Sequence, residues 1–158
     1  TLHGLSKTVG LPGLRVGWLA TRDGATLAAA RTMKNLFNCY LPRPIELLAG
    51  VALRHESTLL ERNSAILADS LEACDGFFQR HDNLFTWQPP MAGVMAFPRW
   101  LDPGGAKALS DRLLDQASVV LAPGPCFDAG DNHVRLGLCK RAFPEALARF
   151  DEFLATGF

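Results

Sequence analysis

The chain has 158 residues, of which 48% are hydrophobic and 20% are charged, and its formal net charge is zero. This composition predicts a globular protein with a core of its own. It excludes the basic surface of a protein that binds nucleic acid or an anionic membrane, and no apolar run reaches the roughly 20 residues needed to span a bilayer.

The cysteines are scattered without the spacing of a metal site, and no secretory signal is visible (Cys39, Cys74, Cys126, Cys139). Free thiols indicate a reducing compartment, so we predict a cytoplasmic protein that binds no metal. Cys126 lies in a Pro-Cys-Phe loop. Burial as a small apolar residue is a commoner role for such a cysteine than a place in a site.

A glycine-flanked lysine opens the chain. Lys7 is followed eight residues later by Arg15, with glycines at positions 4, 10, 13 and 17. A free lysine titrates at about 10.4, so an amine that attacks an aldehyde must be desolvated or placed beside positive charge. Arginine supplies a planar fork for a phosphate, and Gly10 and Gly13 permit tight turns. Residues 15–20 predict a buried strand.

Two helical segments follow. Residues 24–36 are rich in alanine and predict a helix. After a proline-marked break, apolar residues at helical spacing predict one long helix from Ile45 to about Phe78. We interpret its charged residues, including His55, as a solvated face.

The last third alternates short strands with helices. Strands are predicted at 84–88, 93–97, 118–121 and 132–138, and helices at 144–154 and from Asp102 onward. Asp102 would cap its helix, with Pro103 in the first turn. On the strand 132–138, Arg135 faces away from Val134 and Leu136. Its partner would be either a ligand carboxylate or a carboxylate of the protein.

The first motif resembles a known family. Ten residues together resemble the pyridoxal-phosphate attachment site of class I/II aminotransferases, the fold-type-I family: Gly4, Leu5, Ser6, Lys7, Gly10, Leu11, Gly13, Arg15, Val16 and Gly17. The resemblance implies that Lys7 carries pyridoxal 5′-phosphate as a Schiff base and acts as the catalytic base. It implies that Arg15 holds the phosphate, helped by Ser6 and Gly4. Many members place a serine where this chain has Gly4, whose contact would come from the backbone N–H.

The Pro-Gly loop at 122–127 and the strand that carries Arg135 are similar to the family's second site. The resemblance implies that Arg135 binds the substrate α-carboxylate, with His133 in a supporting or structural place. The stretch 90–99 looks like the strand that lines the substrate pocket, where Arg99 would contact a side-chain acid or remain on the surface. Asn38 or Tyr40 would reach the neighbouring subunit's cofactor or serve as loop residues.

The resemblance implies an α/β fold, the C-terminal part of a PLP-dependent transferase fold. Its parts would be the end of the large domain (1–44), a connector helix (45–78) and a small α/β domain (79–158). Because members are about twice as long, we expect this chain to belong to a larger enzyme.

The implied function is transfer of an amino group between an amino acid and a 2-oxo acid by a homodimer, without nucleic-acid or membrane partners. One alternative is a PLP-dependent elimination or cyclisation enzyme of the same family, of the capreomycidine-synthase type. Another is an inert fragment that acts only in dimerisation. Lys7 and Arg135 serve transamination and cyclisation equally.

Overall fold

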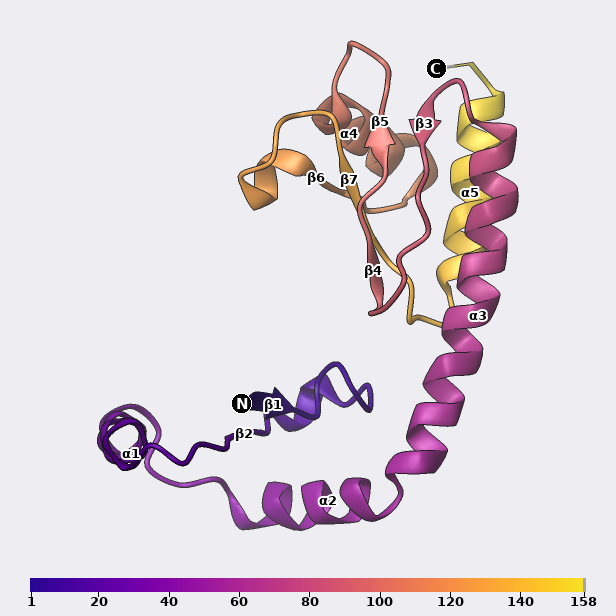
Figure 1. The fold of residues 1–158 in the computed structure, drawn as a ribbon. Helices are drawn as coiled ribbons and strands as arrows, with labels where there is room; N and C mark the ends of the chain where they lie inside the picture. The colour runs from indigo at the N-terminus through magenta and orange to yellow at the C-terminus, as the bar shows by residue number, and fades with distance from the viewer. Residues whose placement is uncertain (158) are drawn as a thin grey trace. The chain divides into compact units, whose positions relative to one another are not determined.

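The computed structural model describes residues 1–157 and divides the chain into two compact units, with the boundary after Asn63 (Figure 1). The first unit contains β1 (Leu2–Gly4), η1 (Pro12–Leu14), β2 (Gly17–Leu19), α1 (Gly24–Phe37), α2 (Arg43–Arg54) and the start of α3 (Glu56–Arg80). The second contains the rest of α3, β3 (Phe85–Thr86), β4 (Met95–Ala96), β5 (Arg99–Trp100), α4 (Ala106–Ala117), β6 (Ala122–Pro123), η2 (Gly124–Phe127), β7 (Val134–Gly137) and α5 (Phe143–Ala155). The mixed α/β class predicted from the sequence is confirmed.

The first unit is built on an antiparallel ribbon of β1 and β2. Leu5 and Val9, from the connecting loop, pack on Ala49 and Ala52 of α2 to form a small core. Further apolar side chains surround it: Leu11, Leu14, Val16 and Leu59. Helix α2 and the first turn of α3 therefore support the loop that carries Lys7.

The buried strand predicted at 15–20 is wrong in both extent and burial. Only Gly17–Leu19 form a strand, and Trp18 and Leu19 remain 38% and 39% exposed. A continuous apolar run predicts a strand covered on both faces. The small core of this unit is built from the loop and α2 and does not include Trp18 or Leu19, so these two side chains are left uncovered within the described residues.

The single helix predicted from 45 to 78 is two helices. His55 takes φ −110° and ψ 25°, and its N–H is shared between the carbonyls of Val51 and Ala52, which ends α2. Its own carbonyl then accepts from Leu59 N in the first turn of α3. Ala52 and Leu59 remain two turns apart and pack on the same cluster. The helical spacing of apolar residues therefore continues across His55 and does not indicate that one helix ends there.

The helix predicted at 24–36 is confirmed as α1, Gly24–Phe37. Asp23 caps it, accepting from Ala25 N at 3.0 Å and Thr26 N at 3.3 Å. The Thr26 hydroxyl, followed by these two amides, lowers the pKa of the Asp23 carboxyl. No helix among the described residues is long and apolar enough to cross a bilayer.

A small antiparallel sheet organises the second unit. Strand β7 lies between β4 and β6, with Met95 opposite Gly137 and Ala122 opposite Arg135. The extended segment beyond β4 stays beside β7: Val134 N donates to Pro98 O, and Trp100 N donates to Asn132 O. Side chains alternate along this segment, so that one face is buried (Ala96, Pro98, Trp100) and the other is exposed (Met95, Phe97, Arg99).

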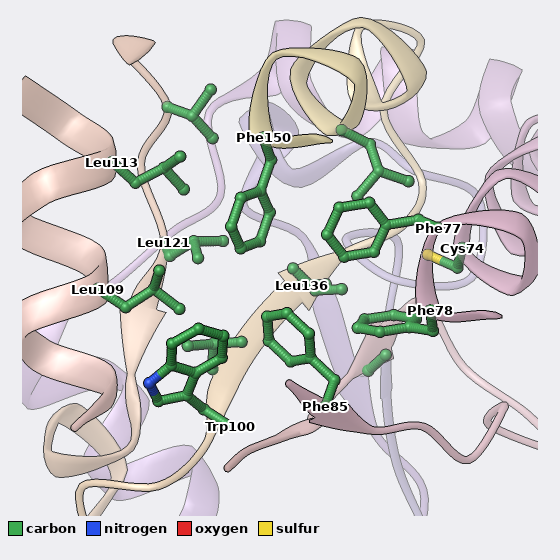
Figure 2. Packing of buried hydrophobic residues seen from close by; sticks show 14 of the residues in the cluster. Cys74, Phe77, Phe78, Phe85, Trp100, Leu109, Leu113, Leu121, Leu136 and Phe150 are labelled. Carbon is green, nitrogen blue, oxygen red and sulfur yellow. The ribbon is translucent and has the colours of Figure 1, made fainter. Parts of the chain in front are cut away.

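The buried face of the sheet is covered by three helices. Figure 2 shows Phe77 of α3, Phe150 of α5 and Leu109 of α4 converging near Leu136 of β7. The Phe77 and Phe150 rings lie 5.0 Å apart, and Phe85 and Trp100 lie 4.8 Å apart. Aromatic pairs of this kind add about 0.5–1.5 kcal/mol each beyond the area they bury. This core fixes the inner face of β7 and leaves its outer face for other contacts.

Helix α4 begins later than predicted. It starts at Ala106, and its cap comes from Asp131, which accepts from Lys107 N at 2.7 Å through its side chain and from Ala106 N at 2.9 Å through its carbonyl. Asp102 instead accepts from Gly104 N in the preceding turn. A cap supplied from 24 residues further along the chain leaves no local signal.

The remaining strand boundaries shift by a few residues. The strand predicted at 118–121 is displaced to Ala122–Pro123, because Ser118 takes a left-handed conformation (φ 56°) that ends α4. Val119 and Leu121 are buried and Val120 is exposed before the strand begins. Strands β3, β4 and β7 lie within the predicted segments but are shorter, and the last helix is confirmed as Phe143–Ala155.

An ion pair joins the end of α3 to α5. Arg80 Nη2 and His81 Nε2 each lie 2.6 Å from a different carboxylate oxygen of Asp151. The His81 ring also packs against Phe77 at 4.8 Å. Burial raises the pKa of Asp151, but the hydrogen bonds from Arg80 and His81 outweigh it, so the pKa lies below its ordinary value of 3.8.

We predict that Asp151→Asn lowers the free energy of unfolding at pH 7 by about 1–2 kcal/mol, the usual size of a charged hydrogen bond at a partly exposed site. Because the folded-state pKa is depressed, this stabilisation is complete above the ordinary value of 3.8 and is lost as pH falls through the folded-state pKa. Urea unfolding should show a smaller difference in the free energy of unfolding between wild type and Asp151→Asn at pH 3 than at pH 7. Asp82→Asn, at an exposed carboxylate, should change neither value.

Candidate active site

The loop between β1 and β2 is held at Leu5. Its N–H donates to Val16 O at 3.1 Å, and its carbonyl accepts from Leu11 N at 3.0 Å. The Leu5 side chain is 1% exposed. Lys7 lies two residues from one end of the Leu5–Val16 hydrogen bond, and Arg15 lies one residue from the other. The closure therefore holds the backbones of both residues within two residues of one hydrogen bond, although they are eight residues apart in sequence.

Lys7 is exposed, whereas Leu5 and Val9 on either side of it are buried. The two apolar anchors leave the lysine between them on the outer side of the loop. Among the described residues Lys7 forms no ion pair, so its amine is open to a ligand. Ser6, directly before it, is half-buried.

Gly4 ends β1 opposite Gly17. Thr1 and Ala20 exchange both backbone hydrogen bonds and Leu5 donates to Val16, so by alternation Gly4 and Gly17 form a non-hydrogen-bonded pair. The Gly4 N–H therefore points away from β2. A Cβ at Gly4 would lie 3.0 Å from Val16 O, tighter than ordinary contacts. This position offers a backbone donor, and a serine here would require the ribbon to shift.

Arg15 follows the short helix η1 in a left-handed conformation, φ 53° and ψ 36°. Its N–H is bonded to Pro12 O, and its Nη1 lies 3.4 Å from the same oxygen. The side chain is exposed and forms no ion pair within the described part of the chain. A non-glycine residue in this region carries backbone strain of about 1 kcal/mol or more. A guanidinium presented in this way is suited to a bidentate anion such as phosphate.

The two loop glycines differ. Gly10 has φ +69°, and a Cβ on it would lie 2.9 Å from Nδ2 of Asn63 on α3. Gly13 lies inside η1 with open space around it and no unusual φ. The predicted need for glycine is therefore specific to Gly10, where the loop rests closely on α3.

His3 is a neighbour of Lys7 that the sequence analysis did not identify. Its Nε2 lies 3.3 Å from the Thr8 hydroxyl, and its ring meets Trp18 edge-on at 4.8 Å. His3 and Thr8 thus contact each other across the turn that holds Lys7. The sequence signal that could have identified them is their position, four residues before and one residue after Lys7.

In the second unit, Arg135 lies on the outer face of β7, as the alternation predicts. Val134, Leu136 and Leu138 are buried in the core, whereas Arg135 is exposed. Its guanidinium carbon lies 4.3 Å from the centre of the Phe127 ring. No carboxylate among the described residues pairs with it, so the protein salt bridge considered as the alternative does not form there.

An aromatic row extends from Arg135 across the same face. Phe127 meets Phe97 edge-on at 6.0 Å, and Phe97 stacks on His133 at 4.9 Å with the rings 12° from parallel. His133 Nδ1 lies 2.7 Å from Asn132 Oδ1. Arg99 is exposed on the neighbouring strand, opposite His133. The outer face of the sheet therefore combines two arginines with three aromatic rings.

The structure groups the predicted residues into two sets. Gly4, Ser6, Lys7 and Arg15 belong to the loop of the first unit, and Arg135 belongs to the sheet of the second. Of the outlying candidates, Asn38 and Tyr40 are exposed after α1.

The expected burial of Cys126 is wrong, because η2 projects from the sheet and leaves this residue exposed. Cys74 is the buried cysteine, and burial, with the nearby Asp75 charge, raises the pKa of its thiol to about 12.

Comparison with known proteins gives consistent matches. The family model described as aminotransferase class I and II matches residues 1–149. Capreomycidine synthase of Streptomyces vinaceus is 30% identical over 154 residues, covering 96% of this chain and 39% of that protein. Aromatic-amino-acid aminotransferase 2 of Thermococcus litoralis is 27% identical over 169 residues, covering 98% and 40%. The chain thus spans about two fifths of these relatives.

Two solved structures share the fold. A PLP-dependent aminotransferase from Streptococcus suis superposes with a TM-score of 0.88 at 28% identity, covering 98% of this chain and 41% of its own. The PLP-dependent cyclase OrfR superposes with a TM-score of 0.81 at 32% identity, covering 97% and 43%.

We predict that Gly10→Ala lowers the free energy of unfolding by about 1–3 kcal/mol, because it combines a left-handed φ with a contact on Asn63. Gly13→Ala is the matched control and should be neutral or slightly stabilising. Urea unfolding followed by circular dichroism measures both. Equal effects of the two substitutions would show that the loop does not rest on α3 through Gly10.

Proposed function

We propose, from the premise that this chain belongs to the class I and II aminotransferase family, that it is the C-terminal part of an enzyme that moves an amino group between an amino acid and a 2-oxo acid. The observation that supports the proposal is the Leu5-closed loop, which carries two exposed cations, Lys7 and Arg15, each within two residues of its closing hydrogen bond. Neither cation is neutralised by a carboxylate of the described chain.

Pyridoxal 5′-phosphate is the cofactor that the family match and the solved neighbours indicate. The residues of the loop fit it: Lys7 offers an exposed primary amine for its aldehyde, and Arg15 offers an exposed guanidinium that pairs with no carboxylate among the described residues for its phosphate. The outward N–H of Gly4 and the hydroxyl of Ser6 are further donors for the phosphate. When bound, the cofactor stabilises negative charge at the substrate Cα.

The protein's own part is to bind, orient and move a proton. Lys7 Nζ, in its neutral form, would take the proton from the substrate Cα and deliver it to the cofactor carbon that receives the amino group. In the second half-reaction it would move a proton in the opposite direction. Arg135 binds the α-carboxylate through two parallel N–H donors and so fixes which Cα bond is aligned for the reaction. Arg15 holds the cofactor in register through its phosphate.

Cyclisation or elimination remains the second candidate. It is supported by similarity to capreomycidine synthase and to the cyclase OrfR at 30% and 32% identity. Proton removal at Cα by Lys7 and carboxylate binding by Arg135 serve both reactions. The third candidate, an inert piece that acts only in dimerisation, differs from both in that Lys7 would carry no cofactor.

We further propose a homodimer in the cytoplasm, with the predicted domain limits of 1–44, 45–78 and 79–158. Helix α1 and its end expose large apolar side chains, including Met33, Leu36 and Phe37 at 51%, 73% and 77%. An exposed patch of this kind suits a subunit interface. All four cysteines are free thiols, which suits a reducing compartment.

We predict that borohydride reduction of the complete polypeptide with pyridoxal phosphate attaches the cofactor covalently to Lys7, because that amine is exposed and the same loop carries the phosphate donor Arg15. Peptide mass spectrometry should locate one label, and Lys7→Ala should abolish it. Lys140→Ala, at an exposed lysine of the second unit, should leave it unchanged. Equal labelling of wild type and Lys7→Ala would contradict the assignment.

Stoichiometry separates the two reactions. Given an amino acid without a 2-oxo acid, a transaminase should form at most one equivalent of 2-oxo acid per site, and adding a second 2-oxo acid should restore turnover. We expect this outcome, measured by chromatography of the products. Continued turnover without an acceptor, with an eliminated or cyclised product, would instead establish the second candidate.

A further inference from the structure

We propose that Phe127 is a positioning residue that holds the Arg135 guanidinium in place for a substrate carboxylate. The proposal rests on the carboxylate-binding role of Arg135 proposed above. Its starting observation is the 4.3 Å separation between the guanidinium carbon and the Phe127 ring centre. Arg135 is exposed and forms no ion pair among the described residues, so this stack is the contact that selects its conformation.

The Phe127 ring is itself held. Phe97 meets it edge-on at 6.0 Å, and Phe97 is stacked on His133, the residue directly before the strand that carries Arg135. Phe97 and Phe127 are 42% and 38% exposed, so the row lies at the surface of the sheet and borders the arginine. The Phe127 ring thus has an aromatic neighbour besides the cation.

The backbone beneath the ring is equally constrained. Gly124, at the start of η2, is buried, and a Cβ on it would come within 2.2 Å of Gly130 O. Gly124 N donates to His133 O at 2.8 Å, and Ala129 N donates to Gly124 O at 3.2 Å. Asp128 ends η2 in a left-handed conformation with φ 54°. Phe127 is therefore carried by a turn that is tied to β7 next to Arg135.

A cation–π contact is suited to this task because the aromatic ring holds the cation without a hydrogen-bond acceptor. The N–H donors of the guanidinium therefore remain available for a bidentate carboxylate. A protein carboxylate in the same place would occupy those donors and neutralise the charge. Without the ring, the long arginine side chain would sample more conformations. Substrate binding would then have to order it, and this entropic cost would lower the affinity.

The test measures the Kd of 2-oxoglutarate by calorimetry on the complete, cofactor-loaded polypeptide. Phe127→Leu keeps an apolar side chain but removes the ring face, and should raise the Kd by about 3- to 30-fold, the range of a cation–π contact. Phe127→Tyr retains the ring and should stay within about twofold of wild type. The KM of the amino acid should rise with the Kd, while kcat changes less.

A double-mutant cycle identifies the route of the effect. In an Arg135→Gln background, Phe127→Leu should no longer change the Kd, because the group that it positions is gone. An unchanged Kd in Phe127→Leu, or an equal rise in the Arg135→Gln background, would overturn the proposal. The proposal would also be overturned if wild type bound 2-oxoglutarate no more tightly than Arg135→Gln does.

Labelling of Lys7 on the same samples tests the proposed function separately. Phe127→Leu should retain the borohydride label, since the loop of the first unit is untouched. Coupled binding through Arg135 and Phe127 without any label at Lys7 would contradict the proposed function while leaving the positioning role intact.

Discussion

The pair of backbone hydrogen bonds at Leu5 is the constraint on which the first unit depends. One bond closes the loop onto Val16 and the other draws in Leu11, while the side chain enters the core with Val9. Hydrogen bonds that are buried with apolar anchors persist, because opening them would expose both polar and apolar groups. The closure therefore restricts the loop, and the burial of Leu5 and Val9 keeps Lys7 on its exposed side.

In the second unit the corresponding constraint is the alternation of the sheet. The core takes one face of β7 through Val134, Leu136 and Leu138, and a shift of one residue would bury Arg135 in their place. Burying a guanidinium without a partner would cost far more than a strand of this length gains. Packing on the inner face thus determines the chemistry that the outer face can present.

These two constraints separate what the sequence predicts from what it does not. The sequence predicts the face of β7 on which Arg135 lies and the presence of Lys7 and Arg15 on one loop. Both follow from local pattern, because strand alternation and motif spacing act over only a few residues. The start of α4 does not, since Asp131 caps it from a distant segment. The break at His55 is invisible to periodicity because Ala52 and Leu59 keep their spacing. The stack of Phe127 on Arg135 depends on how η2 folds back onto β7, and ring orientation in such a turn has no sequence signature.

The two arginines to which we assign anionic ligands, Arg15 and Arg135, are held by different means. Arg15 takes its place from the backbone, in a left-handed turn that the loop closure imposes. Arg135 has an ordinary strand backbone and takes its direction from an aromatic ring. The backbone-held arrangement of Arg15 suits a phosphate that stays bound, because the energetic cost of the backbone strain arises once, when the chain folds. A carboxylate that enters and leaves in each catalytic cycle suits the arrangement of Arg135, because a stacked guanidinium keeps its donors free and in place between ligands.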